Sequence, residues 1–183
     1  MKRLIVVGEK VYFRPIERED IDRGWLDWIN DAEISSGLDT IAPVSRESLE
    51  KYYENSIMSD VRMFAVCCKD NDEYIGNARL SSINWVWRTA AYGRMLGNSA
   101  YHGKGIGTEI LVLLAKYAFL RLNLRRLYTG VLATNIASIK SNEKAGARQE
   151  GIQRQHIFAE GKFHDAVMMG LLRSDFEEKY GIK

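Results

Sequence analysis

The chain has 183 residues, of which 46% are apolar and 27% are charged, and its formal net charge is +2. This size and composition fit one globular domain, so we expect residues 1–183 to form a single domain. The near-neutral charge argues against nucleic-acid or membrane partners, and no apolar stretch suits a membrane span or a secretory leader, so we expect a cytoplasmic protein. Cys67 and Cys68 are adjacent and no histidine has ligand spacing with them, so we expect neither a disulfide framework nor a metal.

The first third of the chain predicts a strand at 11–15 followed by two helices. Asp20 can cap the first helix, and its apolar face then carries Ile21, Trp25, Trp28 and Ile29. Ser45 can cap the second helix. The loop 35–44 between the two helices is long enough to border a pocket.

Three strands are predicted next, at 62–69, 74–86 and 90–96. The first two flank a polar turn at 70–72, so they should form an antiparallel hairpin. After the third strand comes a glycine-rich segment, and then a helix whose apolar residues recur at helical spacing from Ile110 to Leu120.

The last third predicts a central strand, a helix and a closing hairpin. The strand 126–133 is apolar on both faces, and a helix separates it from the strand 90–96, so a parallel pair with a right-handed crossover is expected. Asn135 or Thr134 can cap the next helix, which ends at Gly146. Strands at 149–157 and 164–172 then flank a turn at 159–162, and a charged tail begins at Arg173. The element order indicates a mixed α/β sheet.

Three alternating glycines lie in the segment Tyr101-His102-Gly103-Lys104-Gly105-Ile106-Gly107-Thr108. Glycines let the backbone approach a ligand closely, and a helix start offers unpaired N–H groups, so the segment predicts a pyrophosphate site. A Walker-type loop would need Ser or Thr after Lys104, and a dinucleotide-binding loop spaces its glycines differently. On this segment alone, a turn that only connects two elements stays an alternative.

Two motifs together resemble the GNAT superfamily of N-acetyltransferases. The family's cofactor loop is Gln or Arg, two residues, Gly, one residue, then Gly or Ala, and residues 102–107 match it except at His102. Residues 135–138 and 142–147 are similar to the family's Asn-x-x-Ser helix that ends in Glu-Lys-x-Gly-Phe. Residues 11–15 and 28–31, with Asp20 and Asp165, are similar to the branch of ribosomal-protein alanine and spermidine acetyltransferases. The resemblance covers nearly the whole chain.

The resemblance implies an α/β fold with a mixed, mostly antiparallel sheet flanked by about four helices. A parallel pair, one strand ending at Leu96 and the other starting near Arg126, would splay around acetyl-CoA, separated by a β-bulge in the first of them. A backbone N–H of Met95 or a neighbour would polarise the thioester carbonyl. Asn135 would reach the pantetheine arm. The implied cofactor-binding residues are Met95, Leu96, His102, Gly103, Lys104, Gly105, Ile106, Gly107, Thr108, Asn135 and Ser138.

The usual catalytic residues of the family are absent. Ala91 stands where many members have a glutamate base, and Asn142 stands where many have a tyrosine acid. Ser138, one turn before Asn142, could bond to the sulfur, although a serine without a role fits as well. Glu33, beside the variable loop, is our candidate base, and a solvated surface charge is its alternative reading. The candidate catalytic residues are therefore Glu33, Ser138 and Asn142.

The acceptor is an amine whose class the sequence leaves open. The segment that contains Trp85, Trp87 and Arg88 is similar to one in GNAT enzymes that act on amino sugars. On a strand the two tryptophans would share one face, where a sugar could stack on them. We therefore favour an amino sugar as the acceptor. Acidic residues in 17–39 would suit a polyamine, but a solvated helix face explains them. A protein N-terminus is a further alternative for the acceptor. An alternative to the enzyme is a domain that binds acyl-CoA without catalysis. A homodimer is also left open.

Overall fold

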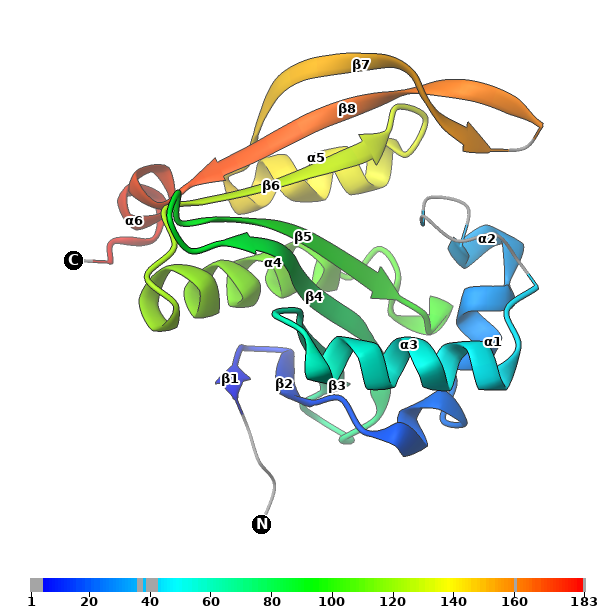
Figure 1. Cartoon of the computed structure of the whole chain (residues 1–183). Coiled ribbons are helices and arrows are strands. Elements are labelled where there is room, and N and C mark those ends of the chain that lie inside the picture. The colour runs from blue at the N-terminus through cyan, green and yellow to red at the C-terminus, as the bar shows by residue number, and fades with distance from the viewer. Residues whose placement is uncertain (1–4, 36–37, 39–42, 160, 183) are drawn as a thin grey trace.

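The structure, a computed structural model, describes residues 5–35, 38, 43–159 and 161–182. Eight strands form one mixed sheet in the order β1-β2-β3-β4-β5-β6-β8-β7 (Figure 1). Helices α1 and α3 cover one face of its first half, and α4 and α5 lie side by side on the other face. The strands are β1 Val6–Val7, β2 Val11–Pro15, β3 Arg62–Cys68, β4 Tyr74–Asn84, β5 Thr89–Leu96, β6 Arg126–Leu132, β7 Arg148–Ala159 and β8 Lys162–Leu172. The α-helices are α1 Trp25–Asn30, α2 Ala32–Ser35, α3 Arg46–Met58, α4 Ile106–Lys116, α5 Ile136–Ala145 and α6 Arg173–Tyr180.

Each face of the sheet has its own apolar core, because successive side chains of a strand point to opposite faces. On one face Phe64 and Val66 pack in the cluster that contains α4. On the other face Ala65 packs with Trp25 and Leu49. The middle of β3 is thus covered on both sides. The prediction of cover on both faces is wrong for 126–133, because Leu127 and Val131 pack in the core on one face only, and Gly130 on the other face is exposed.

The parallel pair β5 and β6 is confirmed, and it is splayed. The two strands pair only from Thr89 with Arg126 to Ala91 with Tyr128. Beyond that point β5 stays paired with β4 and β6 stays paired with β8, so the sheet divides into two halves that diverge (Figure 1). We call the space between β5 after Ala91 and β6 after Tyr128 the wedge. The predicted bulge in β5 is wrong, since the irregular register lies in β4, between Ser81 and Asn84.

The predicted cap at Asp20 is also wrong. Asp20 lies in a 3₁₀ turn at Arg18–Ile21, and α1 begins only at Trp25. Between them Gly24 has a φ of +132°, where a Cβ atom would lie 2.7 Å from the Trp28 ring, so the helix cannot run through. The Asp20 carboxylate is instead buried against Arg14.

Two further differences lie in the second half. After α4 the chain makes a π-turn at Tyr117–Arg121, in which the N–H of Leu122 donates to the carbonyl of Tyr117. This wider turn rotates the residues after Lys116 relative to the apolar face of α4. Leu120, which the helical spacing places on that face, is therefore exposed. The predicted tail from Arg173 is helix α6, which is anchored because buried Phe176 packs edge-on against Phe119 at 5.5 Å.

Candidate functional site

The glycine segment turns from β5 into α4 with a backbone that only glycine adopts easily. Gly103 has a φ of +73° and Gly105, which caps α4, has a φ of +80°. A Cβ atom at Gly103 would meet nothing within 4 Å, so packing against the protein does not explain that glycine. The glycines set the direction of the backbone amides instead. The His102 ring bonds through Nε2 to the Leu96 carbonyl at 2.9 Å and thereby ties the loop to the end of β5.

The start of α4 leaves N–H groups available for an anion. The first helical bond of the backbone is from Glu109 N–H to the Gly105 carbonyl, so the N–H groups of Ile106, Gly107 and Thr108 precede the helical pattern. The one acidic side chain of the first turn, Glu109, accepts bonds from the N–H groups of Lys10 and Val11 in the β2 region. An anion bound at the start of α4 would therefore interact with the positive end of the helix dipole, and the Glu109 carboxylate would not repel it at close range.

A cavity of about 940 Å³ runs from this loop through the wedge to the residues beneath α1 and α3. Its lining contains most of the predicted site residues from both motifs. The predicted residues that line it are Glu33, Met95, Leu96, His102, Gly103, Gly105, Ile106, Gly107, Thr108, Asn135, Ser138 and Asn142. Lys104 does not line it, because its side chain lies over the Tyr101 ring and its carbonyl accepts a bond from Lys10.

The tryptophan segment lies elsewhere. The predicted strand 74–86 ends at Asn84, whose side-chain oxygen accepts the N–H groups of Val86 and Trp87 and thereby closes a turn. This turn precedes β5, whereas the glycine loop follows it, about 25 Å away at ordinary strand rise. Trp85, Trp87 and Arg88 do not line the cavity. The prediction that both tryptophans lie on a strand is wrong, and the structure does not bring them together with the glycine loop.

Helix α5 lines the cavity beside the start of α4, where the Thr108 hydroxyl donates to the Ser141 carbonyl at 3.3 Å. Asn135 caps it, as predicted, by accepting the N–H of Ser138 at 2.9 Å, and Gly146 ends it with a φ of +106°. Ser138 and Asn142 lie one turn apart and both line the cavity. The Nδ2 of Asn135 has no bond to any described residue, so it is available to a ligand in the cavity.

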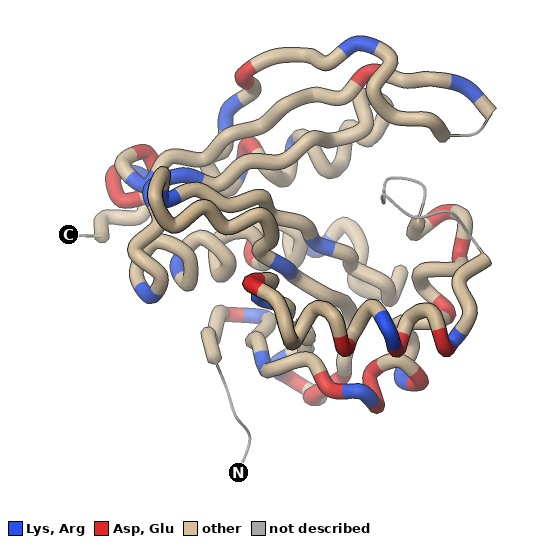
Figure 2. Tube along the Cα trace, viewed as in Figure 1, with Lys and Arg blue, Asp and Glu red and all other residues tan. Residues whose placement is uncertain are grey.

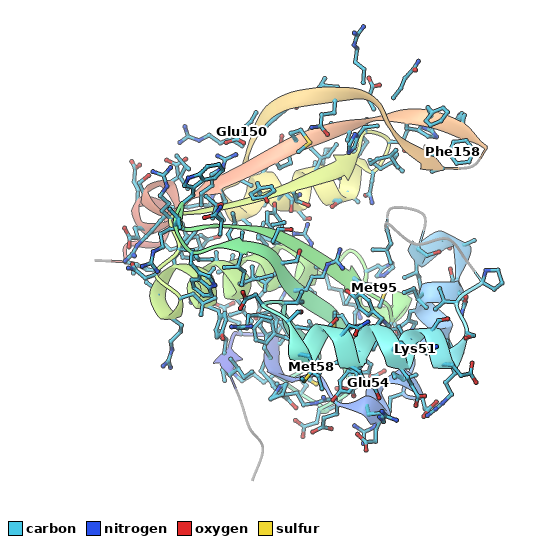
Figure 3. The ribbon with its side chains drawn as sticks, in the orientation of Figure 1. Lys51, Glu54, Met58, Met95, Glu150 and Phe158 are labelled. Carbon is cyan, nitrogen blue, oxygen red and sulfur yellow. The ribbon has the colours of Figure 1, made fainter. Side chains whose placement is uncertain are left out.

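The strand β5 supplies backbone donors to the wedge. Gly97 N–H donates to the Ile75 carbonyl, and the register pairs Met95 with Asn77 and Leu96 with Gly76. Bonded and non-bonded pairs alternate in an antiparallel ladder, so Met95 (labelled in Figure 3) bonds to β4, whereas the N–H groups of Arg94 and Leu96 face the wedge. The sequence predicts Met95 or a neighbour for polarising a carbonyl, and this alternation favours the neighbours Arg94 and Leu96.

Comparison with known proteins identifies the family. The model of the Acetyltransferase (GNAT) domain matches residues 10–148. The chain belongs to this GNAT acetyltransferase family. It is 28% identical over 190 residues to the probable N-acetyltransferase YjcK of Bacillus subtilis, covering 93% of this chain and 98% of that protein. It is 26% identical to the spermidine N(1)-acetyltransferase of Vibrio cholerae, covering 72% of this chain and 76% of the relative.

The fold agrees with that of a solved relative. The crystal structure of spermidine N-acetyltransferase from Vibrio cholerae in complex with CoA and spermine superposes with a TM-score of 0.85 at 26% identity. The match covers 92% of this chain and 99% of that one. This protein is accordingly a GNAT N-acetyltransferase with acetyl-CoA as its cofactor.

Buried polar atoms in the acetyltransferase fit such a cofactor. Three of them have no partner among the described residues, namely Tyr92 Oη, Arg94 Nη1 and Asn142 Oδ1. All three residues line the cavity. Buried polar groups are normally bonded, so three orphans around one cavity indicate a polar ligand there. Burial raises the pKa of Tyr92 to about 12, so its hydroxyl keeps its proton and remains a donor.

Several cavity residues of the acetyltransferase escaped sequence reasoning. Arg79 and Arg94 are single arginines in strands, and no sequence pattern marks them. Lys140 and Lys144 also line the cavity. Their i, i+4 spacing after the Asn135 cap indicates that both side chains lie on the same face of the helix, so the sequence did contain a signal for them.

Within the described ranges, no helix is long and apolar enough to cross a membrane, and no group of three or more His, Cys, Asp or Glu side chains could hold a metal ion. In loop 35–44, residues 36–37 and 39–42 lie outside the described residues, and Leu38 and Val44 border the cavity as predicted.

Two substitutions at Asn135 separate its cap from a role in cofactor binding. Asn135→Asp keeps the oxygen that accepts the Ser138 N–H, so the melting temperature should stay unchanged, but coenzyme A should bind several-fold more weakly because Nδ2 is gone. Asn135→Ala should lose both roles and about 1 kcal/mol of stability. Calorimetry and thermal unfolding measure the two effects. Unaltered affinity in Asn135→Asp would leave Asn135 as a cap alone.

Proposed function

We propose that this acetyltransferase transfers the acetyl group of acetyl-CoA to the primary amine of a small molecule bound in the wedge. One observation carries the proposal: a single cavity joins the glycine loop to a chamber beneath α1 and α3. The pyrophosphate would lie on the amides of 103–108, and Asn135 and Ser138 would hold the pantetheine arm. The amine would enter from the side of Trp25 and Tyr52, so that both reactants meet beside the N–H groups of β5.

The reaction needs a neutral amine. An amine with a pKa of about 10.4 is neutral only about 0.04% of the time at pH 7, which adds about 4.6 kcal/mol to the barrier unless a base removes the proton. Glu33, on α2, is the described carboxylate in the cavity lining and is our candidate base. The thioester supplies the acyl group. The N–H groups of β5 stabilise the negative charge that grows on its oxygen.

A polyamine is the acceptor we favour, because the Vibrio cholerae enzyme that matches this chain both in sequence and in structure is named for spermidine. The amino-sugar interpretation loses its support, since it depended on Trp85, Trp87 and Arg88. The acidic residues of 17–31 do not add to the polyamine argument. The carboxylates of Glu17 and Asp22, on either side of the 3₁₀ turn at Arg18–Ile21, pair with Arg23 and with Arg46 at the start of α3. Figure 2 shows both charges interleaved in this part of the molecule.

An amine panel tests the proposal. Purified protein with acetyl-CoA should release free thiol when spermidine is added, more slowly with an amino sugar or a peptide with an N-terminal alanine. Glu33→Gln should lower kcat on the same acceptor, with little change in KM. If the peptide or the amino sugar were acetylated faster than spermidine, that compound would replace the polyamine as the proposed acceptor. Coenzyme A binding without turnover of any amine would contradict the proposed transfer.

A further inference from the structure

Arg94 is a partly buried cation whose Nη1 is enclosed, and it has no carboxylate partner among the described residues. Its Nη2 donates to the Ser138 carbonyl at 3.4 Å and to the Ser141 hydroxyl, and its Nη1 has no partner. The phenol of Tyr92, two residues earlier on β5, keeps its proton at neutral pH and so supplies no counter-charge. Burial lowers the pKa of the Arg94 guanidinium, which nevertheless stays charged at neutral pH. A buried charge is costly unless it is paired, so a missing anion is the simplest explanation.

The place of Arg94 indicates which anion that is. Its side chain fills the space between α4 and α5, with Nε 3.8 Å from where a Cβ of Gly107 would lie. It lines the cavity with Ser138 and Asn142, the two residues on α5 where the family resemblance implies the sulfur. The acceptor chamber lies on the other face of β5, the face to which Met95 belongs. Arg94 therefore faces the cofactor and not the amine.

We propose that the Arg94 guanidinium binds and stabilises the coenzyme A thiolate as it leaves. The inference rests on the proposed function. The amine nitrogen forms its bond to the acyl carbon, the carbon–sulfur bond breaks, and its electron pair stays on sulfur. The ammonium proton goes to Glu33 or water, and the thiolate takes a proton from water after it leaves the guanidinium. No oxidant or further reactant is needed.

This assignment accounts for the missing acid. Asn142 replaces the usual tyrosine, and an amide has no proton to give to a thiolate. A fixed cation removes the need for one, because an opposite charge within about 4–6 Å lowers a thiol pKa by about 1 to 3. The bound coenzyme A thiol would therefore ionise at a lower pH than the free thiol. The guanidinium would stabilise the negative charge that develops on the sulfur as the carbon–sulfur bond breaks.

Proton release on coenzyme A binding tests the inference without turnover. Calorimetry at about pH 7.5 in buffers of different ionisation enthalpy should show that protons are released when coenzyme A binds, because a lowered pKa ionises part of the bound thiol. Desulfo-coenzyme A, which lacks the thiol, should release none. Arg94→Met should abolish the release with coenzyme A, while Arg94→Lys, which keeps a cation, should retain part of it. Affinity for desulfo-coenzyme A and thermal unfolding show whether each variant is folded.

Arg79→Met is the matched control, because Arg79 lines the same cavity but bonds to the Tyr52 hydroxyl at 2.7 Å on the acceptor side. It should release as many protons as the parent protein. Equal release by Arg94→Met, or no difference between coenzyme A and its desulfo analogue in the parent, would overturn the thiolate role. Failure of coenzyme A to bind the parent at all would overturn the proposed function as well.

Discussion

Replacing Gly103 with valine should weaken coenzyme A binding about tenfold or more while the protein stays folded. A β-branched residue strongly disfavours the φ of +73°, so the loop must move and its amides lose their common direction. A tenfold change in Kd corresponds to about 1.4 kcal/mol, which a few displaced hydrogen bonds to a pyrophosphate easily supply. Calorimetric titration with coenzyme A measures it.

Gly161→Val is the control for backbone strain. Gly161 has a φ of +75° and, like Gly103, open space where its Cβ would lie, but it sits in the turn between β7 and β8. Both variants should lose similar stability, and only Gly103→Val should lose affinity. If the two variants bound coenzyme A equally well, the anion site would have to lie elsewhere.

Replacing Asp20 with asparagine should cost about 3 kcal/mol of stability and lower Tm by about 6–12 °C. Asp20 is fully buried, and its two oxygens accept both terminal nitrogens of Arg14 at 2.7 and 2.6 Å. The carboxylate also accepts the Glu17 N–H at 2.8 Å. The variant leaves the partly buried Arg14 guanidinium, whose pKa that bond raises, with only the exposed Glu17 carboxylate at 3.8 Å as a counter-charge.

Asp22→Asn gives the matched surface comparison. Asp22 also receives two bonds from one arginine, Arg46, at 3.0 and 2.8 Å, but both side chains are exposed. Exposed ion pairs add little because water and salt screen them. Differential scanning calorimetry should find no resolvable shift for Asp22→Asn. Equal shifts for the two variants would mean that burial does not set the strength of the Asp20 pair.

The parts of the site made by backbone could be predicted from sequence. Asn135 and Ser45 before periodic segments predict helix caps, and both caps are found. The glycines before an apolar helix predict a sharp backbone turn, which Gly103 and Gly105 make. The parallel crossover followed from chain order alone.

The parts made by single side chains from distant elements could not. Trp85 and Trp87 alternate like strand residues, and only the side-chain bonds of Asn84 turn them into a loop. Asp20 looks like a helix cap until Gly24 interrupts the helix and Arg14, on another element, claims the carboxylate. Arg94 is a single polar residue in a strand. Its surroundings are formed by α5, more than forty residues later in the chain, so the sequence around Arg94 does not reveal them.

The division of the sheet at Ala91 has a consequence for how such proteins diverge. Two strand edges with unpaired amides face each other in the interior, and edges of this kind accept any extended partner that carries amides of its own. A pantetheine chain is such a partner. Recognition through main-chain atoms does not depend on which side chains a sequence has, so the walls on the amine side can change freely while the donor stays the same. That is consistent with an architecture retained at 26% identity.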